Sequence, residues 1–417
     1  MTRILKLTSQ TEKWLLARRA TQDAEAHRIA AEIVDDVRKR GDAALFAYTK
    51  KFDGTDLVKS GVWIEEKEIL AARKAASVKF RKAIEKAAEN IRRVAEKQLP
   101  QPWTVETTPG VKIHQVVRPI ETIGCYIPGG RFSLVSTLVM TVVPAKVAGV
   151  PNIVALCAKP SPELLAAAGI LGIKRVARIG GAQAIAALAY GTKSVPRVDK
   201  IFGPGNKYVT AAKQIVSNEC AIDLPAGPTE AMVFAERGNA RWIAADVLAQ
   251  AEHAKDAVSF FLTTSPSLAS DVQCEIHTQL EKMPNSMAHC STQVSGAILL
   301  AESAHQAWEF VNRFAAEHLS LPEHSEKLLR EIRASGTVFL GTWAAQPLGD
   351  YATGSNHVLP TGGWARVRGG LSAADFVKCI SVQTITRRGF LQLAETVETL
   401  AESEGLMAHR NAVRVRL

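Results

Sequence analysis

From residue 121 onward the sequence repeats one pattern, in which a short apolar stretch is followed by a glycine turn and then by a helical stretch. The repeats cover residues 121–148, 152–171, 176–189 and 200–216. A second run of strands and helices extends over residues 257–340. Short apolar strands that alternate with helices are typical of parallel sheets, whose strands are buried on both faces and joined by right-handed crossovers. The sequence therefore predicts an α/β protein.

Each glycine turn of the first run follows the carboxyl end of a predicted strand, where open α/β sheets bind their ligands. Glycine there lets the backbone approach a pyrophosphate, and the start of the next helix stabilises negative charge. None of the turns has the GxGxxG spacing of a dinucleotide fingerprint. A nucleotide site therefore rests on the repetition of the turns, and tight loops without a ligand remain the alternative.

With 417 residues, the chain is too long for one small core, which predicts two or more domains. Its formal charge of +10 is compatible with nucleic-acid binding. However, the densest basic segment, residues 79–97, is interleaved with glutamates, as in a solvated helix. A basic surface suits a phosphate-bearing cofactor equally well, so charge alone does not decide, and we expect no nucleic-acid partner.

The six cysteines show no CxxC spacing, which indicates reduced thiols and argues against a sulfur-ligated zinc ribbon. Pro144 and Lys146 interrupt the longest apolar run, residues 133–150, which is therefore not a membrane span. The first ten residues lack the apolar core of a signal peptide. These features predict a cytoplasmic protein that does not bind a membrane.

Residues 242–256 are predicted to form a helix with a polar last part. Gln250 and His253 are three positions apart and would project from one helical face. An amide oxygen beside an imidazole nitrogen is half of a site for a borderline metal such as zinc. Asp350, in a glycine turn, offers a further oxygen ligand. A solvated polar pair and ordinary turn chemistry are the alternatives.

Glu317 and His318 are adjacent at a predicted helix-to-strand junction. Imidazole titrates near neutral pH, and a neighbouring carboxylate can tune it or activate water, so the pair suits general acid–base catalysis. Adjacent side chains need not face the same way, and a helix cap is the alternative. His409, near the C-terminus, reads as a surface histidine from its surroundings alone.

Nearly the whole chain resembles the histidinol dehydrogenase family, which uses zinc and NAD. The resemblance rests on long blocks in the family's order: Tyr126-Ile-Pro-Gly-Gly, Pro144-Ala-Lys-Val-Ala-Gly, Gly180-Gly-Ala-Gln-Ala-Ile-Ala-Ala-Leu, Val198-Asp-Lys-Ile-Phe-Gly-Pro-Gly-Asn, Gln250-Ala-Glu-His, Glu317-His-Leu, Gly349-Asp-Tyr-Ala-Thr-Gly-Ser-Asn-His-Val-Leu-Pro-Thr and Ala408-His-Arg-Asn-Ala-Val. It implies oxidation of L-histidinol through L-histidinal to L-histidine with two NAD, the last step of histidine biosynthesis.

The resemblance also implies roles for individual residues. The ligands of one zinc ion per subunit would be Gln250, His253, Asp350 and His409. Of these, His409 would come from the partner subunit of an intertwined homodimer with shared active sites. The base would be His318, and Glu317 would activate water. The substrate would contact Ser136, Thr229, Gln250, His253, His318, Asp350, Glu404 and His409. NAD would contact Tyr126, Gln183 and Asn206.

The fold that the resemblance implies has two incomplete Rossmann-like domains with parallel sheets, plus small N- and C-terminal extensions. We expect residues 1–120 and 230–360 to form the first α/β domain, with an N-terminal helical extension. Residues 121–229 would form the NAD-binding domain. Residues 361–417 would form a C-terminal extension that contributes to the partner subunit's site.

Two positions depart from the biosynthetic members of the family. Arg131 stands where those enzymes carry a small residue, and Thr229 replaces the usual serine of Gly-Pro-Ser-Glu. Both features resemble a related branch that oxidises sulfonated diols, in which an arginine could pair with the sulfonate. Ser136-Thr137 and the ending around His409 resemble the histidinol enzymes instead. Histidinol is therefore the expected substrate, and a sulfonated propanediol is the alternative.

Overall fold

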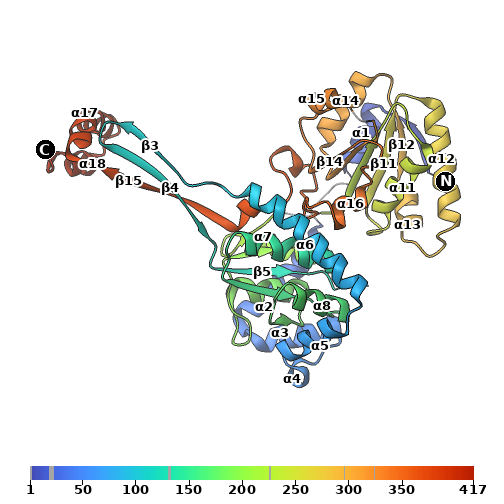
Figure 1. Ribbon diagram of the computed structural model, residues 1–417, viewed down its shortest axis with the longest axis horizontal. Helices are drawn as coiled ribbons and strands as arrows, with labels where there is room; N and C mark the ends of the chain where they lie inside the picture. Colours follow the sequence, from blue (N-terminus) through green and yellow to red (C-terminus); the bar gives the residue numbers. More distant parts are fainter. Residues whose placement is uncertain (1, 18–22, 130–132, 225–226, 295, 324) are drawn as a thin grey trace.

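The computed structural model describes residues 2–17, 23–129, 133–224, 227–294, 296–323 and 325–417. Two six-stranded sheets and one three-stranded sheet organise it. Figure 1 shows each six-stranded sheet within a body of its own, while the three-stranded sheet forms an arm that carries the C-terminus. The α/β class with parallel sheets is therefore confirmed.

The sheet that we call the β5 sheet has the strand order β2-β7-β6-β5-β8-β9. Its strands are β2 (Trp63–Ile64), β5 (Thr122–Tyr126), β6 (Asn152–Leu156), β7 (Val176–Ala177), β8 (Lys200–Phe202) and β9 (Ala221–Ile222). Neighbouring strands pair in parallel, except that β2 is antiparallel to β7. The connecting helices are α7 (Val135–Val147), α8 (Pro162–Ile170), α9 (Gly181–Tyr190) and α10 (Lys207–Val216). This succession confirms the repeats predicted for residues 121–216.

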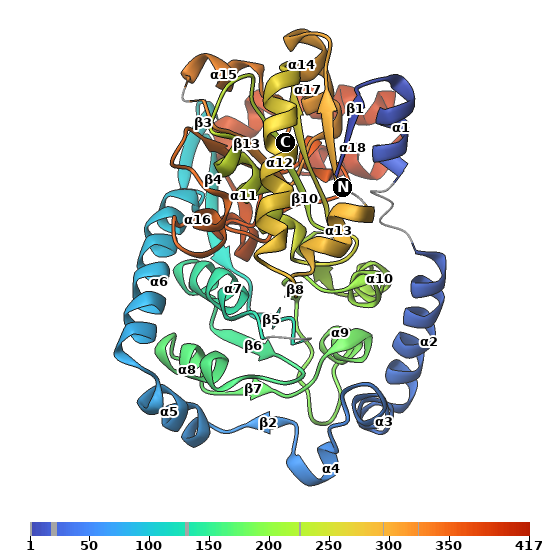
Figure 2. The same cartoon turned by 90° about the vertical axis from the view of Figure 1, so that its right-hand side faces the viewer.

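Earlier helices complete both layers around the β5 sheet (Figure 2). Helices α5 (Glu66–Ala75) and α6 (Val78–Gln98) pack with α7 and α8 on one face. Helices α2 (Ala24–Arg40) and α3 (Asp42–Asp53) pack with α9 and α10 on the other face. Gly41, at φ 55°, ends α2 and starts α3, since glycine adopts this left-handed conformation without strain. The short α4 (Leu57–Ser60) links α3 to β2.

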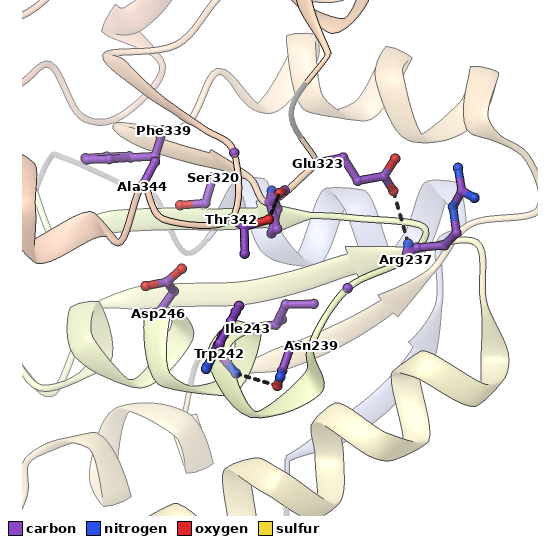
Figure 3. A pocket seen from close by; sticks show the side chains of 13 residues that line it. Arg237, Asn239, Trp242, Ile243, Asp246, Ser320, Glu323, Phe339, Thr342 and Ala344 are labelled. Atoms are coloured by element: carbon purple, nitrogen blue, oxygen red, sulfur yellow. Dashed lines mark hydrogen bonds between the residues drawn. The ribbon is translucent and has the colours of Figure 1, made fainter.

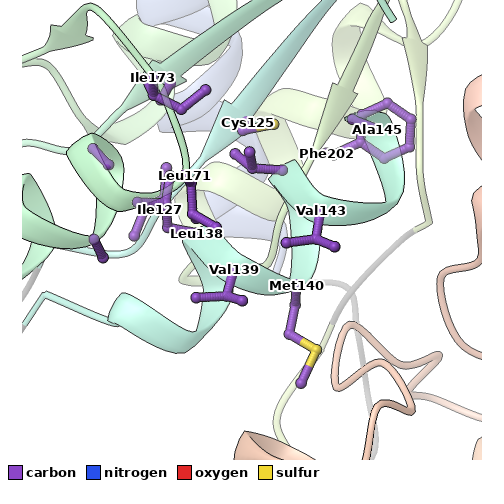
Figure 4. Close-up of a cluster of buried hydrophobic side chains, with 14 of the residues drawn as sticks. Cys125, Ile127, Leu138, Val139, Met140, Val143, Ala145, Leu171, Ile173 and Phe202 are labelled. Carbon is purple, nitrogen blue, oxygen red and sulfur yellow. The ribbon is translucent and has the colours of Figure 1, made fainter. Parts of the chain in front are cut away.

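Apolar side chains of α7 form much of the core on its face of the β5 sheet. Figure 4 shows Leu138 and Val143 of this helix near Cys125, Ile127 and Phe202. Because α7 is apolar on nearly all sides, it can be stable only inside a body. Leu138 is fully buried, so truncating it to alanine should destabilise the fold by about 2–5 kcal/mol. This packing fixes the start of α7, which later bears on the site.

The second six-stranded sheet, the β10 sheet, is parallel throughout, with the order β1-β12-β11-β10-β13-β14. Its strands are β1 (Arg3–Lys6), β10 (Glu230–Phe234), β11 (Val258–Thr263), β12 (Ala297–Leu300), β13 (His318–Leu321) and β14 (Thr337–Leu340). The chain runs outward from β10 through β11 and β12, then returns to β13 on the other side of β10. The order therefore reverses between β10 and β13, and such a reversal commonly marks a binding site.

Helices cover both faces of the β10 sheet. On one face lie α11 (Ala240–Ala251), α12 (Pro266–Glu281) and α13 (Ala288–Val294). On the other lie α1 (Ser9–Ala17), α14 (Ala304–Phe314) and α15 (Glu326–Glu331). The short α16 (Gln346–Tyr351) follows β14 and reaches the body of the β5 sheet. There, Asn90 Nδ2 of α6 donates to the carbonyl of Ala352, directly after α16, at 2.7 Å. The loop around α16 is thus held between the two bodies.

The expected grouping of residues 1–120 with residues 230–360 is wrong for residues 24–98. The helices of this segment pack against the β5 sheet, and β2 joins that sheet directly. Strand β1 and helix α1 do pack with the β10 sheet. Helical periodicity shows which face of a helix is apolar but not which sheet will cover it, so the pattern could not assign these helices.

The arm consists of β3 (Trp103–Thr108), β4 (Val111–Pro119) and β15 (Val377–Ile385) in the antiparallel order β15-β4-β3, with α17 (Arg387–Ser403) and α18 (Met407–Arg414) at its end. Two 3-10 turns, η1 (Trp364–Arg366) and η2 (Ala373–Phe376), precede β15. The arm exposes many apolar side chains, among them Trp103, Ile380, Ile385, Leu391, Val397 and Leu400. In the described part of the chain, no helix is both long and apolar enough to cross a membrane.

Candidate active site

Charged side chains meet at the amino ends of β10 and β13. These adjacent parallel strands begin at Glu230 and His318, and Glu317 directly precedes the second. All three residues are buried, with 1, 3 and 6% of their surface exposed. Two strands that start side by side thus bring the His318 imidazole and the Glu317 carboxylate together beside the backbone of Glu230. Buried charges of this kind are costly unless they are paired, which makes the cluster a candidate site.

His318 lies between two carboxylates. Its Nε2 is 3.4 Å from Asp350 Oδ1, and its Nδ1 is 3.7 Å from Glu317 Oε2. The carbonyl oxygen of Glu230, 3.4 Å away, also faces Nδ1. Burial works against the charged imidazolium, but the carboxylates of Glu317 and Asp350 outweigh it and raise the pKa of His318 to about 10. The two carboxylates therefore stabilise the imidazolium that forms when His318 accepts a proton.

Asp350 is shared between His318 and Gln250. The Gln250 amide donates from Nε2 to Asp350 Oδ2 at 3.0 Å. Burial raises the pKa of Asp350. The hydrogen bond and charge of His318 and the charges of His357 and His253 have the opposite and larger effect, so the net shift of the pKa is downward. Gln250 Oε1 is buried, and no described residue is its hydrogen-bond partner. This oxygen is an acceptor in need of a donor or a cation.

The predicted helix over residues 242–256 is too long at its C-terminal end. Helix α11 ends at Ala251, and the backbone N–H of His253 bonds to the Gln250 carbonyl at 3.3 Å. His253 therefore does not share a helical face with Gln250. Its side chain is exposed, although its charge still acts on Asp350 and His357. The structure thus brings His253 near Asp350 by a turn after the helix.

His357 and Thr137 join the cluster to the other body, and the sequence did not single out this connection. His357 Nδ1 is 2.8 Å from the carbonyl oxygen of Asp350, and His357 Nε2 is 3.2 Å from Thr137 Oγ1. Burial lowers the pKa of His357, which favours the neutral ring with its proton on Nδ1. Ser136 is half-buried and directly precedes Thr137 in the first turn of α7.

Glu230 is another residue that the sequence analysis did not select. Its backbone N–H donates to Glu317 Oε2 at 2.9 Å, and its Oε1 accepts from the Gly362 N–H at 2.9 Å. It thereby ties the loop after residue 360 to the strand that carries the cluster. Thr229, directly before it, is half-buried, and its carbonyl accepts from Val258 in β11. The feature that could have identified Glu230 is a glutamate at the start of a buried strand.

The residues expected at NAD lie at the carboxyl edge of the β5 sheet. Tyr126 ends β5, and its hydroxyl accepts from the Gly181 N–H at 3.2 Å. Gln183 is buried in the first turn of α9, and within the described part of the chain its Nε2 has no hydrogen-bond partner. Asn206 caps α10 by accepting from Tyr208 and Val209. Three glycine turns thus contribute polar groups to one edge.

Glu404 and His409 are not brought to the cluster within one chain. Both are exposed on the arm, on or beside α18, whereas the cluster lies between the two bodies (Figure 1). Accordingly, no group of three or more His, Cys, Asp or Glu among the described residues could hold a metal ion. Arg131 lies outside the described residues.

A cavity of about 300 Å³ occupies the opposite edge of the β10 sheet (Figure 3). It opens between α11 and the ends of β13 and β14, and it contains none of the predicted site residues. Figure 3 shows Asp246 of α11 pointing toward Ser320 and Ala344. Burial raises the pKa of Asp246 to about 6, against a small opposing effect of a hydrogen bond from the Gln346 backbone.

Comparison with known proteins agrees with this geometry. The family model described as histidinol dehydrogenase matches residues 16–417. The chain is 43% identical to a histidinol dehydrogenase of Methanosarcina mazei, over 98% of this chain and 96% of that protein. It is equally identical to one of Vibrio parahaemolyticus, over 99 and 96%. The crystal structure of histidinol dehydrogenase from Elizabethkingia anophelis superposes with a TM-score of 0.92 at 38% identity, covering 100% of this chain and 98% of that one. This chain belongs to the histidinol dehydrogenase family.

Proposed function

We propose that this protein oxidises L-histidinol through L-histidinal to L-histidine, using two NAD and one zinc ion per subunit. The observation that carries the proposal is the buried cluster of Glu317, His318, Asp350 and Gln250. His318 can act as the base, and Glu317 is the carboxylate beside it. Asp350 and Gln250 carry oxygen atoms that can bind a metal ion. Together these groups match what alcohol oxidation followed by aldehyde hydration requires. Membership of the family supports the same substrate.

In the first oxidation, His318 takes the proton of the substrate hydroxyl at Nε2, the atom that faces Asp350. Nδ1 keeps its own proton toward the Glu230 carbonyl and Glu317, which fixes the tautomer. Tyr126, Gln183 and Asn206 would hold NAD at the edge of the β5 sheet, and the bound cofactor would supply the hydride acceptor for both oxidations. In the second, the Glu317 carboxylate takes a proton from water, so that hydroxide adds to the aldehyde and gives the hydrate. The hydrate, which forms as its alkoxide, then loses a hydride to become the carboxylic acid, and the acid releases a proton to give the carboxylate.

The residues fit a zinc ion, although they do not complete its site within one chain. Gln250 Oε1 is a buried acceptor without a partner, Asp350 is held ionised, and His253 lies nearby. Nitrogen and oxygen donors of this kind suit a borderline divalent cation. When bound, zinc would anchor the nitrogens of the amino alcohol and polarise its oxygen. His409 is proposed as the fourth ligand, supplied by the partner subunit.

A homodimer with shared sites accounts for the arm. Glu404 and His409 are exposed at its end, and Val397, Leu400 and Glu404 follow at helical spacing along α17 and its cap. An apolar stripe that continues into a functional carboxylate is suited to docking on another protein surface. We propose that the arm crosses to a second copy and places Glu404 and His409 at that copy's cluster. Cytoplasmic location and the absence of a nucleic-acid partner stay predictions.

The test is NADH formation by the zinc-loaded protein with L-histidinol and, in parallel, a sulfonated propanediol. We expect two NADH per L-histidinol and one zinc ion per subunit by elemental analysis. Turnover of the sulfonated diol alone would replace the proposed substrate by the alternative that Arg131 and Thr229 raise. Silence with both substrates in a zinc-loaded, NAD-binding sample would contradict the proposed function.

A further inference from the structure

Helix α3 runs antiparallel to α9 and delivers its last residue, Asp53, to the carboxyl edge of the β5 sheet. At the start of α3, Asp42 accepts from the backbone and hydroxyl of Ser194, which follows the end of α9, at 3.3 and 2.7 Å. The two helices pack against each other. Asp53, at the other end of α3, therefore lies beside the first turn of α9, which carries Gln183.

The surroundings of Asp53 are those of the predicted nucleotide edge. Its charge acts on Tyr126 at the end of β5 and on Cys157 just after β6, and the Lys159 ammonium acts on Asp53 in turn. Burial raises the pKa of Asp53, although Lys159 opposes this shift. Asp53 Oδ2 is buried and has no hydrogen-bond partner among the residues that the structure describes. A buried carboxylate oxygen without a donor is costly, which indicates that a ligand supplies the donor.

The position matches the adenosine side of a dinucleotide fold. In such folds an acidic residue after the second strand of the unit receives the ribose hydroxyls of NAD, and a basic residue there accommodates the 2′-phosphate of NADP. In this chain β5 is the first strand of the unit and β6 the second. After β6 the sequence reads Cys157-Ala158-Lys159, with a cation where an acid would be expected for NAD. Asp53 brings a carboxylate to this place from another helix.

We propose that Asp53 accepts hydrogen bonds from the adenosine ribose hydroxyls of NAD and thereby selects NAD over NADP. The inference rests on the proposed NAD-dependent function and adds its cofactor selectivity. A 2′-phosphate would add up to two negative charges next to a buried carboxylate, which is strongly unfavourable. Asp53 also opposes the positive charge of Lys159, the group that would otherwise attract that phosphate. Gln183 Nε2, buried and unpaired, offers a donor to the same ligand.

Calorimetric titration of the full-length protein with NAD and with NADP tests the inference without relying on turnover. We expect Asp53→Asn to weaken NAD binding about 10-fold and to strengthen NADP binding, because it removes the acceptor charge and frees Lys159. Asp56→Asn is the matched control: Asp56 pairs with the exposed Lys50 and caps α4, a role that asparagine keeps, so neither affinity should change. The double variant Asp53→Asn/Lys159→Ala should lose the gain for NADP.

Asp53→Ser, measured in the same way, guards against an effect of asparagine itself, and melting temperatures identify any variant that does not fold. An unchanged ratio of NAD to NADP affinity in folded Asp53→Asn and Asp53→Ser would overturn the inference while leaving NAD dependence intact. Wild-type protein that binds no NAD would overturn the proposed function together with it.

Discussion

The buried cluster and the arm hold their functional groups in opposite ways. Glu317, His318 and Asp350 are at most 8% exposed and are fixed by hydrogen bonds to two strands and a short helix. Glu404 and His409 are exposed at the end of an arm whose apolar surface is uncovered in one chain. Folding alone orients the first set, whereas we propose that the second set functions only on another copy of the chain. Under that proposal, one chain carries two half-sites.

The largest effect should come from the cluster itself. His318→Asn removes the base but retains a polar group that can meet the Glu230 carbonyl. We expect kcat to fall about 10²- to 10⁴-fold, since this is the usual contribution of a positioned base. Steady-state kinetics at saturating NAD measures it, with the melting temperature as the check on folding. Retention of more than a tenth of kcat in a folded, zinc-loaded variant would place the base elsewhere.

A charge introduced on the apolar stripe of the arm, Val397 and Leu400, should weaken the proposed dimer. Leu400, in α17, is 58% exposed, and we expect Leu400→Glu to dissociate the dimer because a carboxylate would be buried without a partner at the contact. Leu329→Glu in α15 is the control, because that leucine is similarly exposed, at 49%, on another part of the molecule. Sedimentation velocity distinguishes the two. A Leu400→Glu protein that sediments as the wild type does would mean that the stripe lies outside the interface.

The two parallel sheets could be predicted from the sequence, because short apolar strands alternate with helices in the pattern that parallel sheets require. The glycine turns also located Tyr126, Gln183 and Asn206 at one edge, since strand ends of a parallel sheet share an edge. The partnership of residues 24–98 could not be predicted, because an amphipathic helix does not specify its sheet.

The site was predictable in its residue types but not in its connections. The identities of Glu317, His318 and Asp350 were expected from the family resemblance, yet the hydrogen bond of His357 to Thr137 joins segments more than two hundred positions apart. No local pattern reports such a contact. The end of α11 at Ala251 was likewise missed, because the alanine-rich sequence continues to favour a helix, whereas a turn at Glu252 and His253 ends it.

The smallest effect concerns the carboxylate of Asp246, which lies at the edge of the β10 sheet opposite the cluster. Burial raises the pKa of Asp246 to about 6, above its value of about 3.9 in an unfolded chain. The folded protein therefore binds this proton more tightly, and stability falls as the pH rises from about 4 to about 6, by up to about 3 kcal/mol. Asp246→Asn should remove this loss and be the more stable protein above pH 6. Melting temperatures of both proteins across this range measure the difference, and parallel curves would contradict it.

The most direct test of the two half-sites mixes inactive subunits. Equal amounts of His318→Ala and His409→Ala protein are dissociated, recombined and assayed with L-histidinol and NAD. Each hybrid dimer has one site built from an intact cluster and an intact arm, so random pairing should restore about one quarter of the wild-type activity. The two variants assayed separately should stay inactive. No recovery in a mixture shown to contain hybrid dimers would contradict a site shared between subunits.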